Sequence, residues 1–260
     1  GNLTDELVYL VAAPSTGKTA FVLNWLTCLA WRGHTASLRS LESAKPKIVQ
    51  RIMAQVGRCN TWRLRTHTAH ADDLAGADRA VIGIKDIEQK IRISDAPATM
   101  EQLSAWARIE KSKGAEILMI DNMKHIRPDR KYASPVEQFR DISQRLKWLR
   151  DDIRLPVVVI HHTNKDGDAS WSSDIERDVD TLVIMSEDQG RCTPPSRDNG
   201  WCGNTIILFD VRKQREGAKG FVISARFRGD IQTFEDDAKQ TTAGGDDDLS
   251  GEVPCPPTDN

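Results

Sequence analysis

Apolar residues fall into two kinds of segment along the chain. Runs of five or six apolar residues, such as "LVYLV" and "LPVVVI", are typical of strands that are covered on both faces. Between them lie longer segments whose apolar residues recur every three or four positions, which predicts amphipathic helices. This alternation predicts an α/β fold with a mostly parallel central sheet flanked by helices. The predicted strands span residues 7–11, 36–41, 91–97, 116–121 and 155–160, and the predicted helices span residues 19–33, 45–57, 100–113 and 135–153.

The last third of the chain has a different pattern. Four apolar segments follow one another there, with turns and one longer loop between them. This strand-rich pattern predicts hairpin-like antiparallel strands at the C-terminal end of the sheet. Residues 189–203 contain two prolines and several glycines and asparagines, which predicts an exposed loop. The predicted strands of this part span residues 180–186, 204–213, 220–227 and 231–235.

The composition is ordinary for a soluble globular protein, with 39% hydrophobic and 28% charged residues. A chain of 260 residues suffices for one α/β domain with a full core. No apolar run approaches the roughly 18 residues of a membrane span, and the start carries no secretory signal. We therefore expect a cytoplasmic protein without membrane contact. The five scattered cysteines lack the spacing of a metal site and predict reduced thiols.

Acidic residues gather at the C-terminal end. Residues 235–260 contain eight acidic side chains and one basic one, and the rest of the chain has 35 basic and 30 acidic residues. The resulting net charge of +5 permits a polyanionic partner. Because the end segment has few apolar residues, we expect residues 237–260 to form an acidic disordered tail after a single domain of residues 1–236. A solubilising role is the simpler interpretation of this tail, and a docking peptide is the alternative.

The segment "LVAAPSTGKTAF" at residues 10–21 carries the first candidate chemistry. It joins a predicted strand to a predicted helix and contains Gly-Lys-Thr, which is typical of a loop that binds nucleotide phosphates at a helix N-terminus. Lys18 neutralises the phosphates, and Thr19 offers a hydroxyl to Mg²⁺. Ala12 replaces the usual first glycine, which is tolerable where no positive φ is needed; the alternative is an ordinary glycine-containing turn. The candidate nucleotide-binding residues are Ala13, Pro14, Ser15, Thr16, Gly17, Lys18 and Thr19.

Two carboxylates lie at the ends of predicted strands and are candidates for catalysis. Asp121 ends the strand at residues 116–121, and Glu42 follows the strand at residues 36–41. In doubly wound sheets such strand ends lie at the same edge as the phosphate loop. Asp121 is therefore a candidate, with Thr19, for holding Mg²⁺, and Glu42 is a candidate for polarising the attacking water. Taken singly, each carboxylate has a turn or capping role as its simpler interpretation.

These motifs, in this order, resemble the C-terminal, RecA-like motor domain of the DnaB-type hexameric replicative helicases, including phage forms. The resemblance runs from Leu3 to Asp236 and implies a RecA-like P-loop NTPase fold with ATP and Mg²⁺ as cofactors. It implies that Glu42 is the catalytic base, and that an N-terminal domain and linker helix lie outside these residues. The resemblance rests on the alanine-containing phosphate loop, "SLE" at residues 40–42, "IRISDAPATMEQL" leading to "GAEILMID", "FRDISQRLKWLRDDIRLPVVV", "SSDIERDVDTLVIM" and "KQREG".

The resemblance implies further catalytic roles near the nucleotide. His162, in "IHHTNK", falls where the family places a glutamine or histidine that senses the γ-phosphate, with His161 as the alternative. From the residues alone, a histidine that ends a buried strand is more simply a structural hydrogen-bonding group. Lys213 and Arg215, in "VRKQREG", match the family pair that reaches the ATP of a neighbouring subunit. Without the resemblance, these two residues read as solvated cations of a hairpin.

The resemblance also implies contact with single-stranded DNA. Two expected loops, one after Asp121 and one after His162, face the central channel of a ring in the family and bind the sugar-phosphate backbone of one strand. Such binding is electrostatic and independent of base sequence. Solvated surface charge is the alternative for each basic residue of these loops. The candidate DNA-binding residues are Lys124, Arg127, Arg130, Lys131 and Lys165.

Three functions stay open at the level of sequence. The prediction is an ATP-dependent replicative helicase, which hydrolyses ATP at the subunit interfaces of a homo-oligomeric, hexameric ring, moves along single-stranded DNA and unwinds duplex. A primase or a helicase loader is a further expected partner, and a phage protein of this kind would act in the host cytoplasm. A second function is another RecA-like DNA-dependent ATPase, of recombinase or plasmid-replication type. The third is a DNA-binding or loading module without hydrolysis, against which the full set of catalytic residue types argues.

Overall fold

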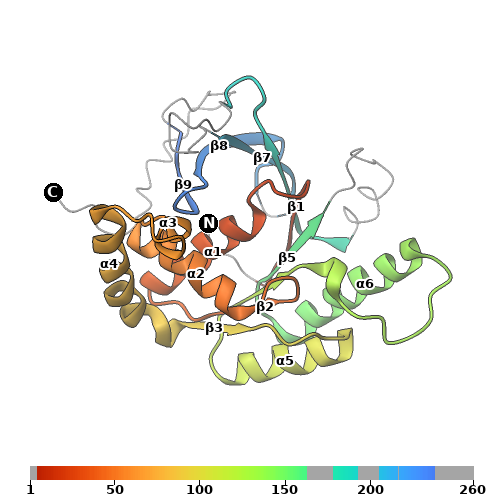
Figure 1. Ribbon diagram of the computed structural model, residues 1–260. Helices are drawn as coiled ribbons and strands as arrows, with labels where there is room; N and C mark the ends of the chain where they lie inside the picture. Colours follow the sequence, from red (N-terminus) through yellow and green to blue (C-terminus); the bar gives the residue numbers. More distant parts are fainter. Residues whose placement is uncertain (1–4, 163–177, 193–204, 216, 238–260) are drawn as a thin grey trace.

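One nine-stranded sheet with helices on both faces organises the chain (Figure 1). The computed structural model describes residues 5–162, 178–192, 205–215 and 217–237. The strand order is β3-β2-β4-β5-β1-β6-β7-β8-β9. The strands are β1 (Leu7–Ala12), β2 (Ala36–Ser40), β3 (Ile91–Ser94), β4 (Ile117–Asp121), β5 (Val157–His162), β6 (Thr181–Glu187), β7 (Thr205–Gln214), β8 (Phe221–Arg228) and β9 (Thr233–Asp236). The helices are α1 (Lys18–Trp31), α2 (Lys45–Gly57), α3 (Thr61–Arg65), α4 (Ala71–Ile87), α5 (Met100–Ser112) and α6 (Pro135–Ile153), with 3-10 turns η1 (Glu88–Lys90) and η2 (Met123–His125).

Six strands of the sheet run parallel and three continue it in antiparallel pairing. β1 lies between β5 and β6 and is parallel to both, and β2 is parallel to β3 and β4. From β6 onward each strand pairs antiparallel with the next, through β7 and β8 to β9. The predicted mostly parallel sheet with antiparallel C-terminal strands is therefore confirmed. Helices follow β1 to β4 and carry the chain back for parallel pairing, and short turns join β7 to β8 and β8 to β9.

Two hydrophobic cores cover the two faces of the sheet, which explains why the central strands are apolar throughout. On β1, alternate side chains from Leu7 to Val11 pack under α5 and α6, and those from Val8 to Ala12 pack under α1 and α2. Successive residues of a strand point to opposite faces. Every residue of β1 is therefore buried.

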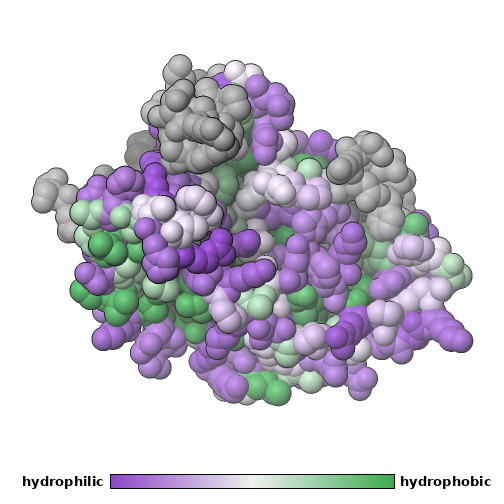
Figure 2. Space-filling view, in the orientation of Figure 1, coloured by the Kyte–Doolittle hydropathy of each residue, from purple (hydrophilic) through white to green (hydrophobic). Residues whose placement is uncertain are grey.

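Residues 58–90, for which the sequence pattern yielded no element, form α3 and α4. The helical spacing is hard to see in α4 because its large apolar residues Leu74, Val81 and Ile82 are exposed, and Figure 2 shows apolar atoms gathered over this helix. α4 packs closely on α2 through glycines: a Cβ atom added to Gly57 would lie 2.1 Å from the carbonyl oxygen of Gly76. The buried face of α4 therefore consists largely of small residues such as Gly76 and Ala80, which give only a weak apolar pattern in the sequence.

Some predictions fall outside the residues that the structure describes. These are most of the loop at 189–203 and the tail from residue 238 onward, so the acidic tail and the domain boundary stay predictions. Among the described residues, the helices are all too short or too polar to cross a bilayer.

Candidate nucleotide-binding site

The phosphate loop connects β1 to α1 and leaves a helix N-terminus open. Ala12 is the last residue of β1, pairs with His162 and Met185, and does not have a positive φ. Alanine therefore fits the first glycine position, as predicted, because no left-handed backbone is needed there. The left-handed positions are Ser15, at φ 67°, and Gly17, at φ 90°. Gly17 precedes α1 without a side-chain cap, so the first N–H groups of the helix are available to an anion.

Lys18 places a buried cation inside this loop. Its ammonium group donates hydrogen bonds to the carbonyl oxygens of Ala12, at 2.9 Å, and Ala13. Burial lowers the pKa of Lys18 to about 8, and the carboxylates of Asp121 and Glu42 act against this decrease. Carbonyl dipoles compensate the charge only in part, so an anion in the loop would stabilise the ammonium form.

Thr19 and Asp121 form the candidate metal site. The Thr19 hydroxyl donates a hydrogen bond of 2.9 Å to Oδ2 of Asp121, which is 1% exposed. Burial raises the pKa of Asp121 to about 6, against the effect of the Thr19 hydrogen bond. The other carboxylate oxygen, Oδ1, is buried and has no hydrogen-bond partner among the described residues. A hydroxyl and a carboxylate with a free oxygen are ligands that Mg²⁺ prefers, so the residues present fit this ion.

Glu42 lies beside Asp121 because β2 and β4 pair in register. Ser40 is opposite Asp121, and the backbone N–H of Glu42 continues the pairing with a 3.3 Å hydrogen bond to the Asp121 carbonyl oxygen. The Glu42 side chain is 42% exposed, and its Oε2 lies 3.3 Å from Nε2 of His162. Asn122 donates a side-chain hydrogen bond to the same Oε2 atom. The structure therefore brings the two predicted carboxylates and one predicted histidine together.

Asn122 is a candidate functional residue that the sequence analysis missed. It is fully buried, and its side-chain oxygen accepts a 3.0 Å hydrogen bond from the backbone N–H of Lys124. Asn122 thus links Glu42 to the start of the first predicted DNA loop. Its position directly after Asp121 was the only available signal, because an asparagine after a strand reads as an ordinary turn residue.

The two histidines at the end of β5 point to opposite faces of the sheet. His162 contacts Glu42 at the site. His161 is buried under α6, where its ring centroid lies 4.7 Å from that of Phe139. Burial lowers the pKa of His161 to about 4, and burial also lowers the pKa of His162. Of the two, only His162 has a direct contact with a candidate catalytic residue.

Lys213 and Arg215 lie at the opposite edge of the sheet from the phosphate loop of their own chain. Lys213 pairs with Leu182 at the start of β6, whereas the phosphate loop follows the other end of the neighbouring strand β1. About 13 Å of strand β1 lies between these two positions, because a strand rises about 3.3 Å per residue. The Arg215 side chain is 54% exposed, and one guanidinium nitrogen lies 2.9 Å from Oδ1 of the buried Asp180. The register therefore places both residues near the strand ends that lie away from the phosphate loop of their own chain.

The predicted DNA-binding residues have different surroundings. Lys124, Arg127 and Lys131 are exposed in the segment that follows β4. Arg130 forms an ion pair with Asp141 of α6 at 2.6 Å and stacks over the ring of Tyr132, with 5.2 Å from its guanidinium carbon to the ring centroid. Arg130 therefore anchors the segment to α6. Lys165 lies outside the described residues.

Comparison with known protein families identifies the family to which the chain belongs. A family model described as the DnaB-like helicase C terminal domain matches residues 1–236. The chain belongs to this family. The DnaB-like chain is 26% identical over 238 residues to the replicative DNA helicase DnaB of Geobacillus stearothermophilus, an alignment that covers 84% of the chain and 50% of the relative. It is 24% identical over 233 residues to the replicative DNA helicase DnaC of Bacillus subtilis (strain 168), again with 84% and 50% covered. The chain thus spans about half the length of these curated relatives.

Solved structures show the same fold. One solved ATPase domain superposes with a TM-score of 0.76 at 22% identity and covers 90% of this DnaB-like chain and 86% of that one. A DnaB-like replicative helicase described with its primase interactions also reaches 0.76 at 22% identity, over 89% of this chain and 57% of that one. A KaiC-like protein of Pyrococcus horikoshii reaches 0.61 at 17% identity, over 90% of each chain. The RecA-like fold and the family resemblance are therefore confirmed.

Replacing His161 with leucine is expected to reduce the acid sensitivity of the fold. Because the folded pKa of His161 is about 4 and its ordinary value is 6.5, the unfolded chain binds a proton below pH 6.5 that the folded chain does not. The wild-type free energy of unfolding should fall between these pH values by up to about 3 kcal/mol more than that of His161→Leu. Urea unfolding across this range measures both slopes. His125→Leu, at an exposed position, is the control, and equal slopes for wild type and His161→Leu would contradict the expectation.

Proposed function

We propose that this chain is the ATP-hydrolysing motor domain of a replicative DNA helicase. The observation that supports the proposal best is that a phosphate loop, a hydroxyl–carboxylate pair and a further carboxylate converge at one edge of the sheet in a DnaB-like family member. Two curated relatives are named replicative DNA helicases, and the chain covers about half of the length of each. The proposed substrate is ATP and the proposed cofactor is Mg²⁺.

Each residue of the site has one task in this proposal. Lys18 exchanges its carbonyl partners for phosphate oxygens, and the N-terminus of α1 donates N–H groups to them. Thr19 and Asp121 hold Mg²⁺, which when bound neutralises charge on the β- and γ-phosphates. Glu42 orients the attacking water and takes its proton. His162 contacts Glu42 and is placed to respond to the γ-phosphate.

Hydrolysis in this proposal requires a second copy of the chain. Lys213 and Arg215 lie near the strand ends away from their own phosphate loop. In this proposal they serve the site of the next copy, where a planar guanidinium suits the spread charge of the transition state. Contacts between unlike faces of identical subunits close into a ring when the rotation permits. By family membership the proposed ring is hexameric.

Single-stranded DNA is the proposed track of the motor. Lys124, Arg127 and Lys131 are exposed and bind the sugar-phosphate backbone, while Arg130 holds their segment against α6. Asn122 joins this segment to Glu42, so DNA that orders the segment also steadies the catalytic base.

Because one solved relative is described with its primase interactions, a primase is a proposed partner, as is a helicase loader. The proposed location is the cytoplasm.

Removing the loop lysine tests turnover. Lys18→Ala should lower the rate of Mg²⁺-dependent ATP hydrolysis by about 100-fold or more, because the cation that stabilises transferred phosphoryl charge is lost. Phosphate release in the presence of single-stranded DNA measures the rate, and Lys111→Ala on the exposed face of α5 is the control. Equal rates for wild type and Lys18→Ala would favour the non-hydrolysing module. Hydrolysis that DNA stimulates without strand separation would favour another RecA-like ATPase.

Mixing two inactive variants tests action between subunits. Arg215→Ala and Glu42→Ala should each lose most ATPase activity alone, and a mixture should recover part of it. The reason is that some interfaces then combine an intact Glu42 from one copy with an intact Arg215 from the next. Mass measurement with nucleotide must first establish that the variants co-assemble. Co-assembly without any recovery would contradict action across the interface.

Replacing Asn122 tests the proposed coupling. Asn122→Ala should reduce the stimulation of ATP hydrolysis by single-stranded DNA by about tenfold, with a smaller effect on the DNA-independent rate, because the link between Glu42 and the Lys124 backbone is cut. Hydrogen exchange at the Lys124 amide should also become faster, since this amide loses its acceptor. Slow exchange together with unchanged stimulation would refute the coupling.

A further inference from the structure

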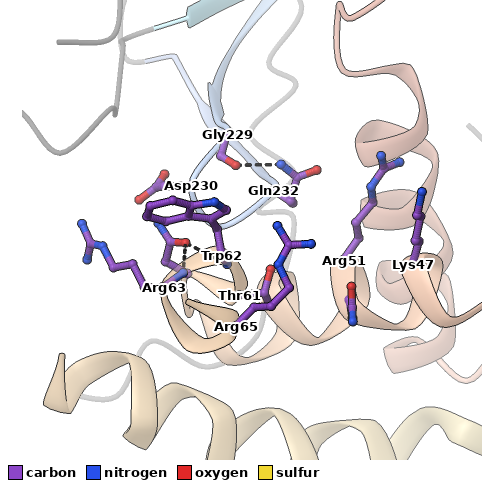
Figure 3. Close-up of a pocket in the computed structure, with 11 residues that line it drawn as sticks. Lys47, Arg51, Thr61, Trp62, Arg63, Arg65, Gly229, Asp230 and Gln232 are labelled. Atoms are coloured by element: carbon purple, nitrogen blue, oxygen red, sulfur yellow. Dashed lines mark hydrogen bonds between the residues drawn. The ribbon is translucent and has the colours of Figure 1, made fainter. Parts of the chain in front are cut away.

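A basic groove lies between α2, α3 and the turn that joins β8 to β9 (Figure 3). The cavity has a volume of about 850 Å³. Lys47 and Arg51 reach it from α2, and Trp62 and Arg65 reach it from α3. Gln232 belongs to the wall that the turn provides. The groove contains none of the residues proposed above for ATP hydrolysis or DNA binding.

Three cations of the groove are unpaired. Lys47, Arg51 and Arg65 form no ion pair or side-chain hydrogen bond with any other described residue. The groove's carboxylate, Asp230, is already bound by Arg228, through hydrogen bonds of 3.0 and 3.1 Å. Like charges that share a cavity without compensation repel one another, and a bound anion relieves that repulsion. The charge of the groove therefore favours an anionic ligand.

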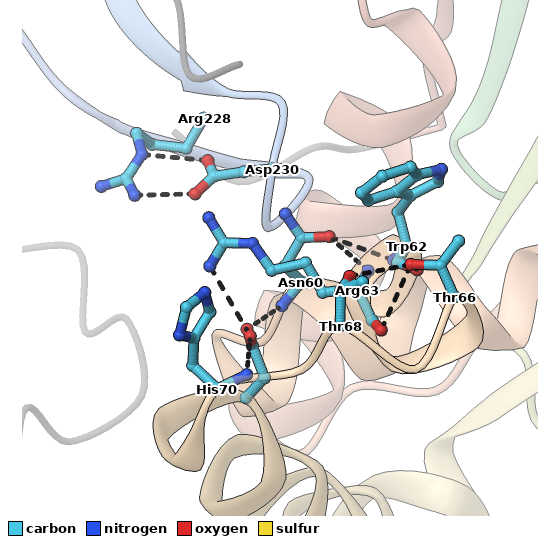
Figure 4. A network of polar contacts seen from close by, with 9 residues as sticks. Asn60, Trp62, Arg63, Thr66, Thr68, His70, Arg228 and Asp230 are labelled. Atoms are coloured by element: carbon cyan, nitrogen blue, oxygen red, sulfur yellow. Dashed lines mark hydrogen bonds and ion pairs between the residues drawn. The ribbon is translucent and has the colours of Figure 1, made fainter. Parts of the chain in front are cut away.

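An exposed indole forms one wall of the groove. Trp62 is 56% exposed, and Figure 3 shows its ring along the cavity. The short helix that carries it is held in place: Asn60 accepts hydrogen bonds of 3.1 Å from the N–H groups of Trp62 and Arg63, and Asp73 accepts one of 2.9 Å from the N–H of Asn60 (Figure 4). The aromatic surface is thus positioned before any ligand arrives, which reduces the ordering cost of binding.

The groove is close to the phosphate loop. Asn24 of α1, the helix that begins at Lys18, donates a 3.2 Å hydrogen bond to the carbonyl oxygen of Gln232 in the groove wall. A Cβ atom added to Gly17 of the phosphate loop would lie 3.4 Å from the rings of Phe227 and Phe234, which belong to the two strands that the turn joins. The groove wall is therefore in direct contact with the helix that begins at the phosphate loop.

We propose that the groove binds a nucleotide unit, with phosphate oxygens on its unpaired cations and the base stacked on Trp62. Stacking on an aromatic ring beside a track of positive charge is how single-stranded nucleic acids are commonly held. The inference rests on the proposed function, since it needs a nucleotide-binding chain. Two sources share this chemistry: the nucleoside end of the triphosphate in the phosphate loop, and a nucleic acid strand. The chain's own acidic tail fits less well, because residues 238–260 contain no aromatic side chain to stack on Trp62.

Binding measurements on the full 260-residue chain test the proposal. The probes are MgATP, inorganic triphosphate with Mg²⁺, and a thymidine oligonucleotide of about 16 nucleotides, near the upper end of single-stranded site sizes. Trp62→Leu should weaken the binding of ATP or of the oligonucleotide by about tenfold. Triphosphate affinity should stay unchanged, because triphosphate has no base. A loss for ATP alone assigns the groove to the nucleoside, and a loss for the oligonucleotide alone assigns it to a strand.

A second variant and matched controls keep the test specific. Arg65→Gln should weaken the same ligand as Trp62→Leu and, for the oligonucleotide, reduce the slope of affinity against salt by about one. Trp148→Leu on α6, where the side chain is 58% exposed, and Lys111→Gln on α5 should change neither affinity.

Two outcomes would overturn the proposal. In the first, both groove variants bind all probes within about twofold of wild type. In the second, a peptide of residues 241–254, measured as a fourth probe, is the one ligand that the groove variants bind more weakly. That result would assign the groove to the acidic tail. Either outcome leaves the proposed function standing if Lys18→Ala still abolishes DNA-stimulated hydrolysis, so the two failures are distinguishable.

Discussion

In the parallel sheet, Ser40 lies beside Asp121 and Ala12 lies beside His162, so the ends of four strands that are far apart in sequence meet at one edge. Every contact of the candidate site depends on this register. A shift of one residue in β4 would turn Asp121 to the other face and separate it from Thr19, and a shift of one residue in β2 would displace Glu42 in the same way. The two hydrophobic cores resist such a shift, because each central strand is buried on both faces. Core packing and site geometry therefore depend on the same constraint.

Burial at this edge acts on opposite charges in opposite directions. It lowers the pKa of Lys18 to about 8 and raises that of Asp121 to about 6, so both groups lie nearer to neutrality than on a protein surface. The two charges partly compensate one another across the loop. A nucleotide with its metal ion would supply an anion to the lysine and a cation to the carboxylate. The site is thus suited electrostatically to a magnesium–phosphate complex more than to either ion alone.

At the other ends of these strands, the buried carboxylate of Asp180 holds several segments together. The carboxylate of Asp180 is buried and accepts a 2.9 Å hydrogen bond from the backbone N–H of Leu7, and ion pairs connect it to Arg150 and Arg215. This anchor holds the end of β7 near the start of β1, where the Arg215 side chain is 54% exposed. The separation of the two edges gives a physical basis for a site completed by a second copy, and the groove beside α3 adds a surface that the family comparison alone did not suggest.

The sequence by itself determined the strand–loop–helix at residues 7–31 and the parallel and antiparallel parts of the sheet, and it marked Lys18, Thr19, Glu42 and Asp121 as candidate site residues. Apolar runs and Gly-Lys-Thr are local patterns, and a local pattern can be recognised in the sequence without the fold. The sequence left α3 and α4 unassigned, because close contacts at glycines hold α4 against α2 and three of its large apolar residues, Leu74, Val81 and Ile82, are exposed. Tertiary structure alone separated His162 from His161, placed Asn122 between Glu42 and Lys124, and bound Arg130 to Asp141. Those relations depend on which side chains from distant segments come within 3 to 4 Å of each other, and only the register and packing of the folded chain decide that.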